Sequence, residues 1–133
     1  MSVYLDANIF GYANYGTAEK GELATKILEK IASGKEHGVT SCLTLDEVMW
    51  ICIKQKKTSE MRQVISDIYR IPNLTILEAP SRIAILAVDF VEEYNLKPRD
   101  AVHCAVMREN GIETIYSEDH DFDRVKWIKR KFL

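Results

Sequence analysis

Apolar residues along the chain alternate between short runs typical of buried strands and longer stretches with helical spacing. The short runs predict strands at residues 3–5, 38–42, 74–77 and 113–116, with at most one short edge strand in the tail, at 125–128. The helical spacing predicts helices at residues 8–15, 19–33, 44–56, from 58 or 59 onward, 81–94 and 98–109. This alternation predicts an α/β fold in which helices cover a parallel sheet.

Composition and charge narrow the class of protein. The 133 residues suffice for a core of their own, so we expect a single domain over residues 1–133. Apolar residues make up 47% and charged residues 29% of the chain, as in ordinary soluble proteins. The formal net charge of −2 provides no global basic field, so a nucleic-acid role would need local positive patches.

Three features favour a soluble protein of the cytoplasm, with no membrane partner. The start of the chain lacks a basic segment followed by a long apolar run, so we expect no signal peptide. The most apolar window, residues 83–91, is much shorter than the roughly 20 residues of a membrane-spanning helix. Three cysteines without a C-x-x-C pair fit thiols that stay reduced in a cytoplasmic setting.

Four acidic residues stand near predicted strand ends or helix starts: Asp6, Glu47, Asp100 and Asp119. Asp6 can simply cap the helix that follows it, and Glu47 fits the S/T-x-x-E capping box that begins at Thr44. Asp100 lies in the first turn of its helix, where an anion complements the dipole, and Asp119 lies in a turn. No single one of these acids indicates a function.

Their shared position changes the interpretation. Asp6 and Asp119 follow strand ends, whereas Glu47 and Asp100 lie in the first turns of helices. Strand carboxyl ends and helix amino ends meet at one edge of a parallel α/β sheet, so we expect the four carboxylates to converge. Like charges at short range raise one another's pKa, and Mg²⁺ or Mn²⁺ relieves the repulsion. The acids together therefore predict a divalent metal site.

Four motifs carry a resemblance to a known family: LDANIF at the start, TLDEV on the third predicted helix, PRDAVHCAVM on the last helix and IYSEDHDFDRV after it. In this order they resemble the PIN domain, and more narrowly the small VapC-type toxin ribonucleases. The resemblance covers residues 4–126. It implies a three-layer α/β/α sandwich with a mostly parallel central sheet of four to five strands.

The resemblance also implies roles for individual residues. The four acids would be the catalytic residues and would hold one or two ions of Mg²⁺ or Mn²⁺. Asn8 and Ser117 would be polar supports that orient the carboxylates or a bound water. The family often has Ser or Thr at both places, so Asn8 is a departure from the pattern. Asp121 either joins the shell of a second ion or faces solvent.

The activity implied by the resemblance is that of a metal-dependent endoribonuclease, the toxin of a VapBC-type toxin–antitoxin pair. The implied partners are an RNA substrate, a second copy in a homodimer, and a cognate antitoxin that occupies a groove near the site. Two alternatives stay open: a PIN nuclease in RNA processing without an antitoxin, and a non-catalytic PIN-like module that binds RNA or protein. The presence of all four acids favours an enzyme, because degenerate modules usually lose acids.

Basic residues provide candidates for contacts with the RNA backbone. Arg99 precedes Asp100, and the remaining candidates are Lys54, Lys56, Lys57 and Arg124. A solvated helix face or tail is the commoner meaning of such runs, and phosphate contacts are the interpretation if the chain is a nuclease. His103 and Cys104 carry side chains that bind metals, but zinc would need at least two more Cys or His at matching spacing. We expect these two residues to pack or to flank the site.

Overall fold

The computed structural model describes residues 2–132, within which no helix is long and apolar enough to cross a membrane. The elements follow one another as β1 (Ser2–Leu5), α1 (Ala7–Tyr15), α2 (Ala18–Ala32), β2 (His37–Ser41), α3 (Cys42–Lys54), η1 (Thr58–Glu60), α4 (Met61–Tyr69), β3 (Leu74–Leu77), η2 (Ser81–Ile83), α5 (Ala84–Tyr94), α6 (Pro98–Glu109), β4 (Thr114–Tyr116), η3 (His120–Arg124) and β5 (Lys129–Lys131), where η denotes a short 3₁₀ helix.

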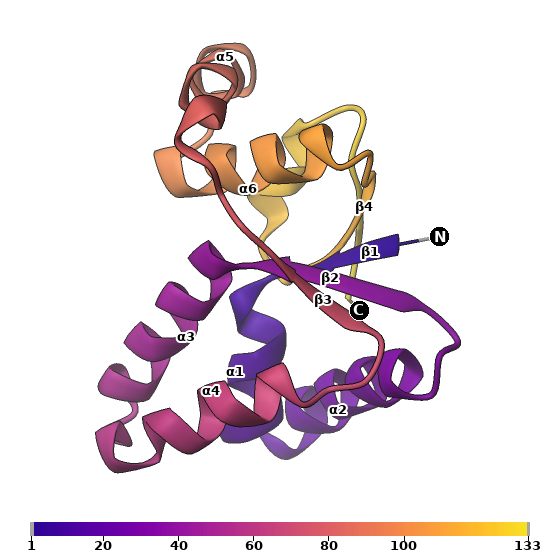
Figure 1. The fold of residues 1–133 in the computed structure, drawn as a ribbon, viewed down its shortest axis with the longest axis vertical. Coiled ribbons are helices and arrows are strands. Elements are labelled where there is room, and N and C mark those ends of the chain that lie inside the picture. The colour runs from indigo at the N-terminus through magenta and orange to yellow at the C-terminus, as the bar shows by residue number, and fades with distance from the viewer. Residues whose placement is uncertain (1, 133) are drawn as a thin grey trace.

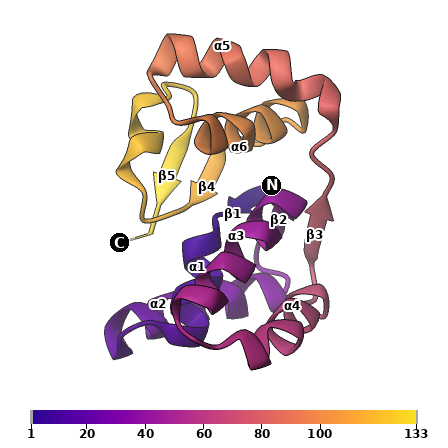
Figure 2. The same ribbon diagram turned by 90° about the vertical axis from the view of Figure 1, so that its left-hand side faces the viewer.

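The five strands form one sheet in the order β3-β2-β1-β4-β5, and every neighbouring pair is parallel. Helices α1 to α4 cover one face of the sheet, and α5 and α6 cover the other (Figure 1). Figure 2 shows α5 on the outer side of α6, so α6 is the helix next to the sheet. The predicted α/β/α sandwich with a mostly parallel sheet of four to five strands is confirmed.

The central strand β1 divides its side chains between two cores. Successive side chains of a strand point to opposite faces. Val3 and Leu5 pack with the helices α1 to α4, whereas Tyr4 packs with α5 and α6, and all three are buried. Asp6 follows Leu5 in extended backbone, with φ −78° and ψ 161°. It therefore stands at the carboxyl end of the most protected strand of the sheet.

The order of the sheet reverses between β1 and β4. β2 follows β1 in the sequence and lies on one side of it, whereas the later strand β4 lies on the other side. Leu5 is in register with Tyr116, so the two strands end at the same level. In open α/β sheets, ligands bind at such a switch point, outside the carboxyl ends of the strands. The topology thus puts Asp6 and Ser117 where a ligand site is expected.

The helix predicted over residues 44–56 starts earlier than expected and ends at Lys54. α3 begins directly after β2, and its N-cap residue Ser41 makes no side-chain cap bond. Ser41 Oγ is instead hydrogen bonded to the Tyr4 hydroxyl at 2.7 Å in the core. Thr44 is buried inside the helix. The predicted capping box is therefore wrong, and Glu47 lies in the second turn of α3 rather than the first.

The tail also differs from the prediction. Residues 120–124 form η3 and residues 125–128 form no strand, so the expected edge strand at 125–128 is wrong. The strand lies further on, at β5, where Lys129 is in register with Thr114 of β4. Its sequence Lys-Arg-Lys contains no apolar residue, so no hydrophobic pattern marks it. Charged side chains on an edge strand are a common protection against pairing with other chains.

Candidate active site

Asp6 is the most deeply buried acid of the site, with 6% of its surface exposed. Its Oδ1 accepts a hydrogen bond from the backbone N–H of Ala7 at 2.7 Å and so caps α1, as expected from the sequence. Its Oδ2 accepts from the Ser117 hydroxyl at 2.5 Å and from the Asn8 amide at 3.2 Å. Three donors therefore hold this carboxylate in one orientation.

Asn8 and Ser117 also tie the end of β1 to the turn after β4. Asn8 Nδ2 donates to Ser117 Oγ at 3.3 Å, and Asn8 Oδ1 accepts from the backbone N–H of Glu118 at 3.2 Å. Ser117 Oγ in turn accepts from the backbone N–H of Asp119 at 3.0 Å. One amide and one hydroxyl thus fix the turn that carries Asp119 relative to Asp6. Asn8 therefore supports Asp6 although it differs from the Ser or Thr that is common in the family at this position.

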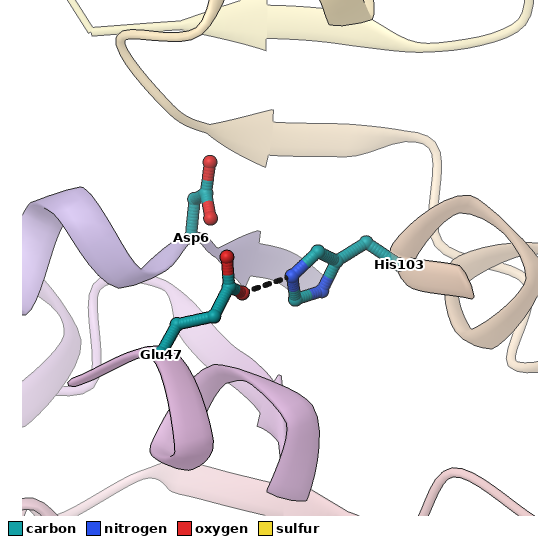
Figure 3. A group of neighbouring side chains, drawn as sticks. All are labelled: Asp6, Glu47 and His103. Atoms are coloured by element: carbon teal, nitrogen blue, oxygen red, sulfur yellow. Dashed lines mark hydrogen bonds and ion pairs between the residues drawn. The ribbon is translucent and has the colours of Figure 1, made fainter. Parts of the chain in front are cut away.

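Glu47 reaches the site from α3. Its Oε1 accepts a hydrogen bond from His103 Nε2 at 2.5 Å, and 20% of its side chain is exposed. Figure 3 shows the other oxygen of Glu47 turned toward Asp6. One ligand atom each of Asp6, Glu47 and His103 lies within 4.8 Å of the others. The acid after the first strand and the acid on α3 are therefore brought together.

A second group is formed by Asp100, Asp119 and Asp121, whose ligand atoms also lie within 4.8 Å of one another. Asp100 comes from the first turn of α6, as predicted. Asp119 caps η3 by accepting from the backbone N–H of Asp121 at 2.9 Å. The Asp121 carboxylate also pairs with Arg124 at 3.1 Å. The four predicted acids thus reach one edge of the sheet in two groups, and Asp121 belongs to the second.

The two groups of acids act on each other electrostatically. Burial raises the pKa of Asp6, despite the lowering effects of His103 and the Ser117 hydrogen bond. Burial also raises the pKa of Asp100 to about 6, and the charges of Asp119 and Asp6 add to this shift. A divalent cation would remove this repulsion, and carboxylate oxygens are the donors that Mg²⁺ and Mn²⁺ prefer. The donor set therefore fits either ion.

The shift at Asp100 predicts a pH dependence of stability in the metal-free protein. Asp100 keeps its proton up to about pH 6 in the folded state, compared with 3.8 for an ordinary Asp. The folded state thus binds more protons between these values, so this contribution favours folding at low pH and is lost as the pH rises toward 6. We expect Asp100→Asn to raise the melting temperature more at pH 7 than at pH 4.5. Thermal unfolding in EDTA checks this, and an equal gain at both pH values would contradict it.

His103 packs and flanks the site, in agreement with the sequence interpretation. The ring is fully buried, and it bonds Glu47 through Nε2. Its second hydrogen bond joins Nδ1 and the Tyr4 hydroxyl at 2.7 Å, and no pattern along the chain indicates it. The one available signal is the spacing of three residues between Asp100 and His103, which puts both on the same face of α6.

Two of the basic candidates lie beside the acids. Arg99 precedes Asp100 in the first turn of α6, and its half-exposed side chain reaches Asp46 of α3 at 3.6 Å. Arg124 pairs with Asp121 and also donates to the backbone carbonyl of Asn95 at 2.9 Å. Arg99 is therefore the less constrained of the two.

The three lysine candidates lie at the far end of α3. Lys54 comes seven residues after Glu47, which corresponds to roughly 10 Å along a helix. Lys56 and Lys57 follow the end of α3, and Lys57 pairs with Glu60 at 3.7 Å. Figure 1 shows α3 leading away from the sheet. These lysines are therefore separated from the carboxylates and could contact only a more distant part of a long RNA.

Arg130 of β5 braces the turn that carries Ser117. Its guanidinium donates to the Ser117 carbonyl at 3.0 Å and to Asp123 at 2.9 Å, and 15% of its side chain is exposed. We expect Arg130→Met to lower the free energy of unfolding by about 1–2 kcal/mol, because the buried carbonyl loses a charged donor. Urea unfolding measures this, with the exposed neighbour Lys129→Met as the control. Equal stability of the two variants would contradict the bracing role.

The fold and the site place the chain among α/β proteins that gather carboxylates at the switch point of a parallel sheet. Here the carboxylates come from separate segments of the sequence and meet at one edge. The model of the PIN domain family matches residues 3–128. The chain belongs to the PIN domain family, which confirms the resemblance seen in the sequence.

Two relatives are similar over nearly the whole chain. Ribonuclease VapC2 of Methanocaldococcus jannaschii is 26% identical, over 96% of this chain and 91% of the relative. Ribonuclease VapC13 of Mycobacterium tuberculosis is 29% identical, over 96% of this chain and 98% of the relative.

Solved structures share the fold at lower identity. The crystal structure of Mycobacterium tuberculosis VapC20, described as a sarcin–ricin loop cleaving toxin, gives a TM-score of 0.74 at 17% identity, over 91% of this chain and 92% of that one. VapBC2 from Rickettsia felis, bound to a DNA fragment from its promoter, gives 0.73 at 18% identity over 98% of both chains. At these identities the likeness establishes the fold alone.

Proposed function

We propose that the protein is an endoribonuclease that hydrolyses RNA phosphodiester bonds with the help of Mg²⁺ or Mn²⁺. The observation that carries the proposal is the gathering of Asp6, Glu47, Asp100 and Asp119 at one edge of the sheet in a chain of the PIN family. The names of its relatives support it, since both VapC2 and VapC13 are called ribonucleases. The complete set of acids disfavours a non-catalytic module.

The acids would hold one or two ions, with Asp121 as a further ligand in the second group. A divalent ion lowers the pKa of bound water and stabilises the attacking and leaving oxygens of an in-line displacement on phosphorus. Ser117 and Asn8 keep the Asp6 carboxylate oriented and ready to bind. Asp100, with a pKa of about 6, is mostly ionised at neutral pH and available as a ligand.

The thiol of Cys104, which feels the charges of Asp100 and Asp6, is a poor nucleophile. Cys104 follows His103 in α6 and is fully buried. Burial, together with the charges of Asp100 and Asp6, raises the pKa of this thiol to about 12. The thiolate is the reactive form of cysteine, and it is scarce at neutral pH when the pKa is so high. This supports direct attack on phosphorus by water rather than by the Cys104 thiolate.

Arg99 is the strongest candidate for a contact with the RNA backbone next to the acids. Its side chain is half exposed, and its ion pair to Asp46 is long at 3.6 Å. An exposed pair of this kind contributes little, so the guanidinium is free to turn to a phosphate. Arg124 would have to give up its bond to Asn95 to do the same.

We also propose that the protein is the toxin of a VapBC-type pair. Several structures with this fold are toxin–antitoxin complexes, including one from Klebsiella pneumoniae. A hollow of about 500 Å³ between α3 and α4, lined by apolar and polar side chains in equal number, offers a surface for an antitoxin segment, and Tyr69 in its lining is 64% exposed. Its apolar lining comes from Met49, Met61, Ile65 and Tyr69. An amphipathic helix is the kind of segment that fills such a groove.

The proposed activity is tested by incubating the purified protein with RNA in EDTA and then with added Mg²⁺ or Mn²⁺. We expect cleavage only with metal. The resemblance to PIN nucleases implies products with 5′-phosphate and 3′-hydroxyl ends, which form when water attacks phosphorus and the 3′-oxygen leaves. Cyclic 2′,3′-phosphate ends, or cleavage in EDTA, would contradict it. Inhibition by the product of a small neighbouring gene would support the toxin assignment, and a PIN nuclease of RNA processing would show none.

A further inference from the structure

A chain of hydrogen bonds runs from the core to the site behind Glu47. The Tyr4 hydroxyl lies 2.7 Å from Ser41 Oγ and 2.7 Å from His103 Nδ1. His103 Nε2 then reaches Glu47 Oε1 at 2.5 Å. Tyr4, Ser41 and His103 are each 0% exposed, and they come from β1, β2 and α6. Three separate elements of the fold thus meet at one carboxylate.

The direction of these bonds follows from the chemistry of the groups. An ionised carboxylate only accepts hydrogen bonds, so His103 Nε2 carries the proton that it shares with Glu47. In the neutral ring, Nδ1 accepts from the Tyr4 hydroxyl, whose oxygen accepts from Ser41. In the protonated ring, Nδ1 donates to the same oxygen, and the partners are unchanged. Every polar atom of the imidazole has a partner. The ring is therefore held in one orientation by contacts on both sides.

This arrangement determines how Glu47 is presented to the site. Glu has three rotatable side-chain bonds, so an unrestrained Glu would sample many orientations. The bond to His103 occupies Oε1, and Figure 3 shows the remaining oxygen directed toward Asp6. Both nitrogens of His103 are already bonded within the protein, so the ring acts on an ion through Glu47 and not as a ligand.

We propose that His103, held from behind by Tyr4 and Ser41, is a positioning residue that fixes Glu47 for binding a divalent cation. This inference rests on the proposed function, since it requires Glu47 to be a ligand of the ion. Hydrogen-bonding partners behind metal ligands hold them in place, and their loss typically weakens metal binding by about 10- to 100-fold.

The test is calorimetric titration of Mn²⁺ into the full-length protein and its variants. We expect His103→Leu to weaken binding roughly 10- to 100-fold. His103→Gln should recover most of this loss, because its amide N–H can replace Nε2–H. Tyr4→Phe should lie between the two, since it removes the support of the ring and leaves Glu47 untouched. Wild-type affinity in His103→Leu, or in Tyr4→Phe if the Leu variant does not fold, would overturn the proposal.

Two controls test whether His103 acts through Glu47. The first excludes a loss of Mn²⁺ affinity that does not involve Glu47, and the second excludes direct binding of the ion by the imidazole. In a Glu47→Ala background, His103→Leu should cause no further loss of affinity, because a residue that acts through Glu47 has nothing left to position. An additive loss would overturn the proposal. Pulsed EPR of the Mn²⁺-loaded wild type should show no coupling to a coordinated imidazole nitrogen, and such a coupling would make His103 a direct ligand instead.

If the acids do not form a metal site at all, the variants give a different result. Asp6→Asn should weaken Mn²⁺ binding whatever the role of His103, because it removes a carboxylate from the site. Unchanged affinity in Asp6→Asn would overturn the proposed metal site, and with it the positioning role of His103. Weak binding in Asp6→Asn together with wild-type binding in His103→Leu would overturn the positioning role alone.

Discussion

Asp6→Asn is expected to reduce RNA cleavage on the order of 10²- to 10³-fold, the range seen when one preorganised electrostatic group is removed from an active site. The fold should survive the change. Asn is as good an N-cap residue as Asp, so the bond to the backbone N–H of Ala7 can remain. The amide that replaces Oδ2 can donate to Ser117 Oγ, and a buried charge disappears.

Cleavage of a labelled RNA at saturating Mg²⁺ measures this effect, and thermal unfolding of the metal-free variant measures the fold. The matched control is Asp67→Asn, an exposed acid on α4 whose partners are Gln63 and Arg70. The control should cleave at the wild-type rate. Wild-type cleavage by Asp6→Asn would show that the acids are a structural cluster, and an unfolded variant would show that Asp6 is needed for the fold.

Mn²⁺ should raise the melting temperature on the order of 10 °C once its concentration reaches about 100 times its dissociation constant. A ligand that binds only the folded state at this ratio stabilises it by about 2.7 kcal/mol, and a chain of this size gains roughly 3–5 °C per kcal/mol. After burial, the charges of Asp119 and Asp6 are the next causes of the raised pKa of Asp100, and this repulsion should favour binding of a cation and so lower its dissociation constant.

A titration of the melting temperature against Mn²⁺ at pH 7 checks this prediction. Asp100→Asn provides the matched comparison, because it removes the repulsion and a ligand in a single change. The variant should melt above the metal-free wild type and respond little to Mn²⁺. A flat response of the wild type would favour a non-catalytic PIN-like module, and an equal response of the two proteins would place the ion elsewhere.

The positions of three of the four acids could be predicted from the sequence. The local pattern indicates where their strands and helices end or begin, and the topology of a parallel sheet then brings these ends together. Asp6 and Asp119 follow strands whose apolar runs are clear, and Pro98 marks the start of the helix that carries Asp100. Once the sheet is parallel, these places converge on one edge. Glu47 was also expected there, but in the first turn of a helix that begins at Thr44; α3 begins at Cys42, so Glu47 lies in its second turn.

Other features depend on side-chain geometry that no local pattern encodes. The division of the acids into two groups is set by how each side chain turns after its element ends. The bond between Tyr4 and His103 joins residues 99 positions apart, so spacing along the chain cannot indicate it. β5 is held by backbone hydrogen bonds to β4 and has no apolar residue, so the hydrophobic pattern misplaced it.

A crystal soaked in Mn²⁺ decides whether the four carboxylates form a divalent metal site, on which the proposed activity depends. We expect an anomalous scattering peak within coordination distance of Asp6, with Glu47 or Asp100 as a second ligand, and loss of the peak in crystals of Asp6→Asn. A soak at the concentration that raises the melting temperature, yielding peaks only away from these carboxylates, would contradict the metal site.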